Sequence, residues 1–267
     1  MSVDLEAYLA RIGQDGPLAP TYDTLCRLLR AHMSRIPFEN LDVLLGRPIR
    51  LDLEAVQAKL VTARRGGYCY EHATLFRAVL ERLGFHTTAH AARVVLLTAR
   101  TESPRTHMFL TVALPEGRFM IDPGFGSQAP RLPIPLEDGA EIRVGHEHHR
   151  LARDEWGWVL QAEVAGKMNP AWLSTMEAEN PIDFELANHF TSTHPKSPFT
   201  VRLLARALTD DGRVGIMNRD VTIVRNGASE SHVLADRHAL RALLREHFGF
   251  DLPEVEQLRI GSVPEWQ

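Results

Sequence analysis

A cysteine that follows a pair of glycines and a tyrosine is the residue of this sequence best suited to covalent chemistry. Cys69 follows Gly66, Gly67 and Tyr68, and the apolar spacing of residues 70–83 predicts a helix that begins directly after it. Unpaired N–H groups and the dipole at a helix start favour the thiolate, which is the nucleophilic form of cysteine. Cys69 is therefore a candidate nucleophile, the alternative being a cysteine that only packs at a helix end.

A histidine and an aspartate supply the groups that such a thiol needs. His107 begins the predicted strand 107–114, and Asp122 ends the predicted strand 118–122. A tight turn at 115–117 makes the two strands a hairpin, so both side chains lie at its same end. If the register places them on one face, Asp122 accepts one imidazole N–H and leaves the other nitrogen for Cys69. The alternative for each residue alone is that His107 is a strand histidine with its hydrogen bonds satisfied and that Asp122 only caps the turn before Pro123.

The elements that position these residues follow from the hydrophobic period. Helix-type spacing over residues 3–12, 22–33, 53–63 and 70–83 predicts a helical N-terminal part. Strands are expected at 88–97, 107–114, 118–122, 141–144 and 156–164, in the manner of an antiparallel barrel. Beyond about residue 193 we expect strands at 199–208 and 213–225 and a helix at 235–248. The sequence thus predicts an α+β chain divided into residues 1–86, 87–195 and 196–267.

Composition excludes several function classes. The 267 residues carry a formal net charge of −4, which argues against a nucleic-acid or anionic-lipid partner. Without a long apolar run or a secretory leader, the chain is expected to be neither membrane-spanning nor secreted, and cytoplasmic by default. Two cysteines cannot form a disulfide framework or a four-cysteine zinc site. Cys26 is expected to be a buried core thiol. The run His146-Glu147-His148-His149 is interpreted as a solvated loop or strand end, and no metal is expected.

The ordered motifs resemble those of the arylamine N-acetyltransferases. The resemblance rests on the segments 37–41 (PFENL), 64–69 (RRGGYC), 105–107 (RTH) and 122–126 (DPGFG), with a later echo in residues 190–199. It implies an N-terminal helical bundle, a central β-barrel and a C-terminal α/β lid around a cysteine-protease-like catalytic core. It also implies acetyl-CoA as the donor and an aromatic amine, hydrazine or N-hydroxyarylamine as the acceptor, as in the metabolism of foreign compounds.

The resemblance also implies roles for individual residues. Cys69 would be acetylated, with His107 as its base and Asp122 as the orienting carboxylate. The aromatic pocket would be lined by Phe38 and Phe125, and the pantetheine end of coenzyme A would lie near Thr106 and Gly126. Glu39 and Arg64 would form a structural ion pair. Two positions depart from the family pattern: Ala73 stands where asparagine is usual, and Pro123 replaces a small or β-branched residue.

These expectations imply a ping-pong reaction through an acetyl-cysteine. Three alternatives stay open at this point. The chain could be an amide-forming acyltransferase that releases a polyketide chain, a cysteine hydrolase such as a protease or transglutaminase-like enzyme, or a binding protein with an inert Cys69. The physiological acceptor, the preference among acyl-CoA donors and the oligomeric state are not determined by the sequence.

Overall fold

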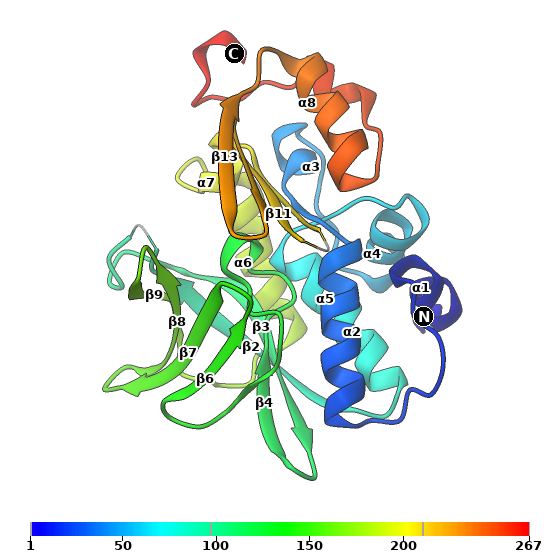
Figure 1. The fold of residues 1–267 in the computed structure, drawn as a ribbon, viewed down its shortest axis with the longest axis vertical. Helices are drawn as coiled ribbons and strands as arrows, with labels where there is room; N and C mark the ends of the chain where they lie inside the picture. Colours follow the sequence, from blue (N-terminus) through cyan, green and yellow to red (C-terminus); the bar gives the residue numbers. More distant parts are fainter. Residues whose placement is uncertain (1, 97, 210, 267) are drawn as a thin grey trace.

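The computed structural model describes residues 2–96, 98–209 and 211–266. The N-terminal helices lie beside a barrel of strands, and a second sheet with its own helix lies at the opposite end of the molecule from strand β4 (Gly117–Ile121) (Figure 1). No helix within the described ranges is both long and apolar enough to cross a membrane.

Five helices form the N-terminal part, and their starts follow ordinary capping rules. The side chains of Asp4, Thr21 and Asp52 each accept a backbone N–H of the helix that they precede. The helices bury their apolar stripes in one shared core, which confirms the helical pattern of this part. They are α1 (Leu5–Ile12), α2 (Tyr22–Arg35), α3 (Leu41–Leu44), α4 (Leu53–Gln57), which continues as a π-helical turn (Ala58–Thr62), and α5 (Cys69–Arg82).

An eight-stranded antiparallel sheet follows and curls into a nearly closed barrel. Its strand order is β5-β4-β3-β2-β9-β8-β7-β6, and the two outer strands β5 and β6 also contact each other. Trp172, Phe109 and Leu160 are among the residues that fill its interior. The strands are β2 (His86–Val94), β3 (Arg105–Leu114), β4 (Gly117–Ile121), β5 (Ile134–Pro135), β6 (Ala140–Val144), β7 (Glu147–Asp154), β8 (Gly157–Val164) and β9 (Lys167–Ser174).

The C-terminal part builds a second antiparallel sheet onto a strand from the N-terminal part. Strand β1 (Phe38–Glu39) pairs with β10, so the sheet order is β1-β10-β11-β12-β13. The short segment 38–39 therefore connects this sheet to the helices that surround Cys69. The remaining elements are α6 (Pro181–Thr193), α7 (Pro198–Val201), β10 (Leu204–Thr209), β11 (Gly212–Met217), β12 (Asp220–Arg225), β13 (Ala228–Val233) and α8 (Arg237–Leu243), which continues as a π-helical turn (Leu244–Phe248).

The structure differs from the predicted elements where polar or turn residues interrupt the period. The predicted strand 199–208 begins as helix α7, because Pro198 suits a first helical turn. The predicted strand 213–225 is two strands, separated by a turn in which Asn218 has a φ of 59°. Strand β2 ends at Val94, and Leu97, the last residue of the predicted strand 88–97, lies outside the described residues. Helix α6, strands β7, β9 and β13, and the short elements β1, α3 and β5 were not predicted.

Two interpretations of single residues were wrong. His148 and His149 are buried on β7. Nδ1 of His148 donates to the Glu163 carboxylate at 2.8 Å, and Nε2 of His149 donates to the Gln128 carbonyl oxygen at 3.0 Å. Cys26 is only half-buried and lines a cleft. Among the described residues, no group of three or more His, Cys, Asp or Glu side chains is arranged so that it could hold a metal ion.

Candidate active site

Cys69 is the first residue of helix α5, and its thiol is buried. The residue is 4% exposed, and its Sγ lies 4.0 Å from the carbonyl oxygen of Thr106. The backbone N–H of Tyr68 is taken by the Glu71 carboxylate at 3.1 Å, which is one half of a capping box. The sulfur therefore lies at the positive end of the helix dipole, as the sequence predicts.

Close backbone approach explains three glycines around Cys69. A Cβ on Gly66 would overlap the carbonyl oxygen of Pro37, and a Cβ on Gly67 would lie 2.7 Å from Oε2 of Glu71. A Cβ on Gly124 would lie 2.7 Å from the Cα of Cys69 and 3.0 Å from the Cβ of His72. The loop after Asp122 is thereby brought directly against the start of α5.

His107 and Asp122 meet at one end of the β3–β4 hairpin. Leu110 pairs with Ile121, and this register allows the Nε2–H of His107 to donate to Oδ2 of Asp122 at 2.7 Å. The same oxygen accepts the indole N–H of Trp172 at 3.0 Å. His107 is 2% exposed and Asp122 is fully buried. The hairpin thus brings the two predicted side chains together on one face.

The environment of His107 strongly favours the imidazolium. Burial lowers its pKa, but the charge and hydrogen bond of Asp122, followed by a hydrogen bond with Cys69, raise the pKa of His107 to about 10. With Nε2 bound to Asp122, Nδ1 is the ring nitrogen left for Cys69. His107 and Asp122 are therefore joined by a buried hydrogen bond, and the buried Cys69 thiol is a neighbour that contributes to the raised pKa of His107.

The four predicted binding residues lie around this set. The Phe125 ring is 4.7 Å from the His107 ring, centroid to centroid. The Phe38 ring lies against Gly126, 3.4 Å from the position that a Cβ would take there. Phe38 also faces Phe199, with ring centroids 6.2 Å apart. Thr106 presents its carbonyl oxygen to the cysteine sulfur.

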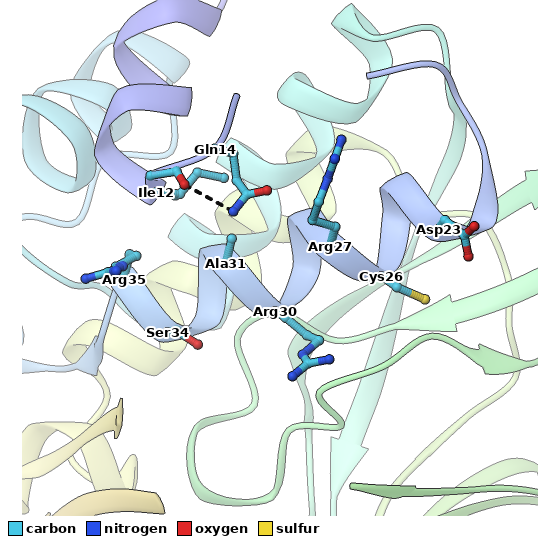
Figure 2. A pocket seen from close by; sticks show the side chains of 10 residues that line it. Ile12, Gln14, Asp23, Cys26, Arg27, Arg30, Ala31, Ser34 and Arg35 are labelled. Carbon is cyan, nitrogen blue, oxygen red and sulfur yellow. Dashed lines mark hydrogen bonds between the residues drawn. The ribbon is translucent and has the colours of Figure 1, made fainter. Parts of the chain in front are cut away.

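A largely apolar groove lies between α6 and the start of β3. It has a volume of about 460 Å³, and Thr106, Arg105, Phe184 and Phe190 are among its lining residues. A second cleft, between α1 and α2, is lined by Cys26, Asp23 and three arginines and contains none of the predicted site residues (Figure 2). Of these two, the groove along α6 is the one that includes a predicted site residue, Thr106, whose carbonyl oxygen lies 4.0 Å from Sγ of Cys69.

The expected ion pair of Glu39 uses Arg65, not Arg64. The Arg65 guanidinium donates to Oε1 of Glu39 at 2.7 and 3.1 Å, and both side chains are buried. Arg64 instead adopts a left-handed backbone conformation with a φ of 54°. This turn points the next residue inward, so the motif predicted the pair but placed it one residue too early.

Two functional contacts were missed from the sequence. Trp172 donates to Asp122, and Arg206 donates to the carbonyl oxygen of Gly126. Arg206 is 4% exposed and also pairs with Glu147 at 3.1 Å. Two features of the sequence could have indicated these contacts. Trp172 has a polar N–H that needs a partner when the ring is buried, and Arg206 is a charged residue within an apolar strand pattern.

Comparison with known proteins defines the class of this protein. A family model described as N-acetyltransferase matches residues 21–257. The arylamine N-acetyltransferase of Mycolicibacterium smegmatis is 43% identical, with 98% of this chain and 99% of the relative covered. That of Escherichia coli is 37% identical, with 96% and 92% covered. The chain belongs to the arylamine N-acetyltransferase family.

Solved structures agree with this assignment. The structure of the Mycobacterium tuberculosis arylamine N-acetyltransferase superposes with a TM-score of 0.89 at 41% identity, covering 94% of this chain and 96% of that one. The Mycobacterium marinum enzyme in complex with CoA superposes with a TM-score of 0.90 at 38% identity, covering 94% of both chains.

Proposed function

We propose that this protein transfers the acetyl group of acetyl-CoA to aromatic amines, arylhydrazines or N-hydroxyarylamines through an acetylated Cys69. The observation that carries the proposal is the buried hydrogen bond between His107 and Asp122 beside a thiol at a helix start. Cys69 is the nucleophile, His107 the general base and Asp122 the residue that orients His107. Family membership and the CoA complex of a relative support the donor.

The reaction has two half-reactions with a shared proton carrier. The Cys69 thiolate attacks the thioester carbonyl, the C–S bond to coenzyme A breaks, and the leaving thiolate takes the proton of the His107 imidazolium. The amine nitrogen then attacks acetyl-Cys69, and neutral His107 removes its proton as the thiolate leaves. The high pKa of His107 suits the imidazolium that donates its proton in the first half-reaction and forms again in the second.

Binding roles follow from the positions of the aromatic and small residues. Phe38 and Phe125 are proposed to hold the aryl ring, which is supported by their places against Gly126 and His107. Thr106 and Gly126 are proposed to lie beside the pantetheine end of coenzyme A. The apolar groove along α6 offers a route for one of the substrates.

The larger organisation belongs to the same proposal. Residues 1–86 would supply the cysteine and residues 87–195 the histidine and aspartate, in a core like that of cysteine proteases. Residues 196–267 would act as a lid, a role supported by the pairing of β10 with β1 next to Phe38. A reactive free thiol suits the reducing cytoplasm, where we place the reaction on foreign or endogenous aromatic amines.

Release of free coenzyme A from a panel of donors and acceptors tests the function. With acetyl-CoA, we expect steady release only when an aromatic amine or hydrazine is present, and none from Cys69→Ala. Release that is equally fast with water alone would support a hydrolase. Activity only with a carrier-bound polyketide chain would support the amide-forming alternative, and no release with any pair would support a binding protein.

A further inference from the structure

A chain of buried hydrogen bonds runs through the helical part to the backbone beside Phe38. The Tyr8 hydroxyl on α1 lies 2.9 Å from Nδ1 of His32 on α2, and Nε2 of His32 lies 2.8 Å from Nδ1 of His72 on α5. Nε2 of His72 lies 3.2 Å from the carbonyl oxygen of Pro37. All three side chains are at most 1% exposed. The reaction proposed above uses none of them.

The hydrogen bond from His72 to Pro37 determines which atom donates and which accepts in every hydrogen bond of this series. A carbonyl oxygen only accepts, so His72 must carry its proton on Nε2. If His72 is neutral, its Nδ1 accepts and therefore requires the Nε2–H of His32. A neutral His32 then accepts at Nδ1, and the Tyr8 hydroxyl must be the donor. Each neutral ring has one permitted tautomer, and only a hydroxyl at position 8 completes the set.

Burial supports the neutral state of both rings. Burial lowers the pKa of His72 to about 4, against the opposing effect of its hydrogen bonds to the Pro37 and Gly67 backbone. The pKa of His32 is lowered by burial and then by its neighbour His72. Burial also raises the pKa of Tyr8, which keeps its hydroxyl protonated and able to donate.

The end of the chain meets the segments that form the candidate site. Pro37 precedes Phe38, and its carbonyl oxygen also accepts the N–H of Gly67 at 3.2 Å. His72 is one helical turn after Cys69, and its Cβ would be 3.0 Å from a Cβ on Gly124. His72 therefore contacts the segments that carry Phe38, Cys69 and Phe125.

We propose that Tyr8, His32 and His72 are positioning residues that fix the Pro37–Phe38 segment against the start of α5. The inference rests on the proposed function, since Phe38 is taken to hold the aryl ring. Removing the Tyr8 hydroxyl leaves Nδ1 of His32 without a donor. The Pro37 carbonyl still requires the Nε2–H of His72, so the unmet acceptor on His32 weakens the contact of α2 with α5, and the position of His72 against Pro37 is held less firmly.

Nitrogen-15 NMR of the imidazoles tests the chain directly in the wild-type protein. We expect both His32 and His72, assigned with His32→Gln and His72→Gln, to carry their protons on Nε2 at neutral pH. A proton on Nδ1 of His72 would overturn the proposal. The tautomers are measured without turnover. The experiment therefore distinguishes an error in the proposed hydrogen-bond series from an error in the proposed function, which would appear as an inactive wild type.

Kinetics of Tyr8→Phe supply the second arm, with Tyr22→Phe on α2 as the matched control. We expect the KM for the aryl acceptor to rise roughly fivefold in Tyr8→Phe. The rate at which Cys69 is acetylated should change less than twofold, because the thiol and His107 are untouched. Tyr22→Phe should leave both unchanged. A Tyr8→Phe protein that loses only thermal stability, with an unchanged KM, would show a merely structural role.

Discussion

At the scale of single residues, the site depends on how Asp122 is held. Its Oδ2 accepts from both His107 and Trp172, so the indole N–H holds the same oxygen that accepts from the imidazole. The residue types Cys69, His107 and Asp122 could be chosen from the sequence because each lies beside a glycine or at a strand end. Trp172 could not, because Asn169 and Pro170 interrupt the alternation that would mark its strand.

Trp172→Phe isolates the second donor to Asp122. The substitution keeps an aromatic ring against Phe109 but removes the indole N–H. We expect kcat/KM to fall at least about tenfold, since one lost hydrogen bond to a charged group costs roughly 1.5–3 kcal/mol and about 1.4 kcal/mol is a factor of ten. Trp158→Phe on β8 is the control and should retain full activity. Equal activity of the two variants would show that the indole contact does not support Asp122.

The raised pKa of His107 predicts how stability depends on pH. An unfolded histidine loses its proton near pH 6.5, whereas His107 keeps it up to a pKa of about 10. The folded state therefore binds more protons between these values, and stability falls as pH rises through that window. The unfolding free energy of the wild type minus that of His107→Gln should decrease from pH 7 to pH 10. A difference that is flat or grows with pH would contradict this ionisation.

At the scale of elements, close packing of the 122–126 loop on α5 joins the two halves of the site. Gly124 lies where a side chain would meet both Cys69 and His72. The sequence predicts a turn after Asp122 from the residues Pro123 and Gly124. It does not reveal which element the turn packs against, because that contact depends on the arrangement of barrel and bundle.

Gly124→Ala tests this contact. The added methyl must displace the loop or the helix start, at a cost of about 1–3 kcal/mol in unfolding free energy. We expect slower alkylation of Cys69 by iodoacetamide as well, because the loop carries Phe125 and follows Asp122. Gly215→Ala on β11, where a Cβ meets nothing nearer than 3.9 Å, is the control and should stay within 0.5 kcal/mol of the wild type. A harmless Gly124→Ala would show that the approach is not tight.

At the scale of the whole molecule, a partly buried ion cluster connects the barrel to the second sheet. Glu147 on β7 accepts from Arg131, Arg206 and Arg213, and Arg206 also holds the Gly126 carbonyl. Burial raises the pKa of Glu147, but the three guanidinium groups together hold it below its usual range. The cluster thus links the loop beside the site to both sheets.

Glu147→Gln tests whether this cluster supports the assembly. Arg206 is buried and would lose its charged partner, so we expect a loss of roughly 3–5 kcal/mol in unfolding free energy, measured by urea denaturation. Glu265→Gln removes an exposed partner of Arg219 and should cost less than about 1 kcal/mol. Comparable small losses in both variants would mean that the cluster contributes little.

The sequence predicted local structure better than the connections between parts. Stripes such as Leu25, Leu28 and Leu29 in α2 identify helices because burial follows the helical period. Pairing of Phe38–Glu39 with β10 joins residues more than 160 positions apart, and no local pattern reports it. The ion pair of Glu39 was displaced by one residue because the left-handed turn at Arg64 is not visible in the residue types.

The acetylated cysteine is the central claim, and mass spectrometry tests it most directly. After incubation with acetyl-CoA and no acceptor, we expect one added acetyl group on the peptide that contains Cys69, and its loss when an aromatic amine is added. Cys26→Ala should behave like the wild type. An unmodified Cys69 in folded protein that still forms the acetylated amine would contradict the account.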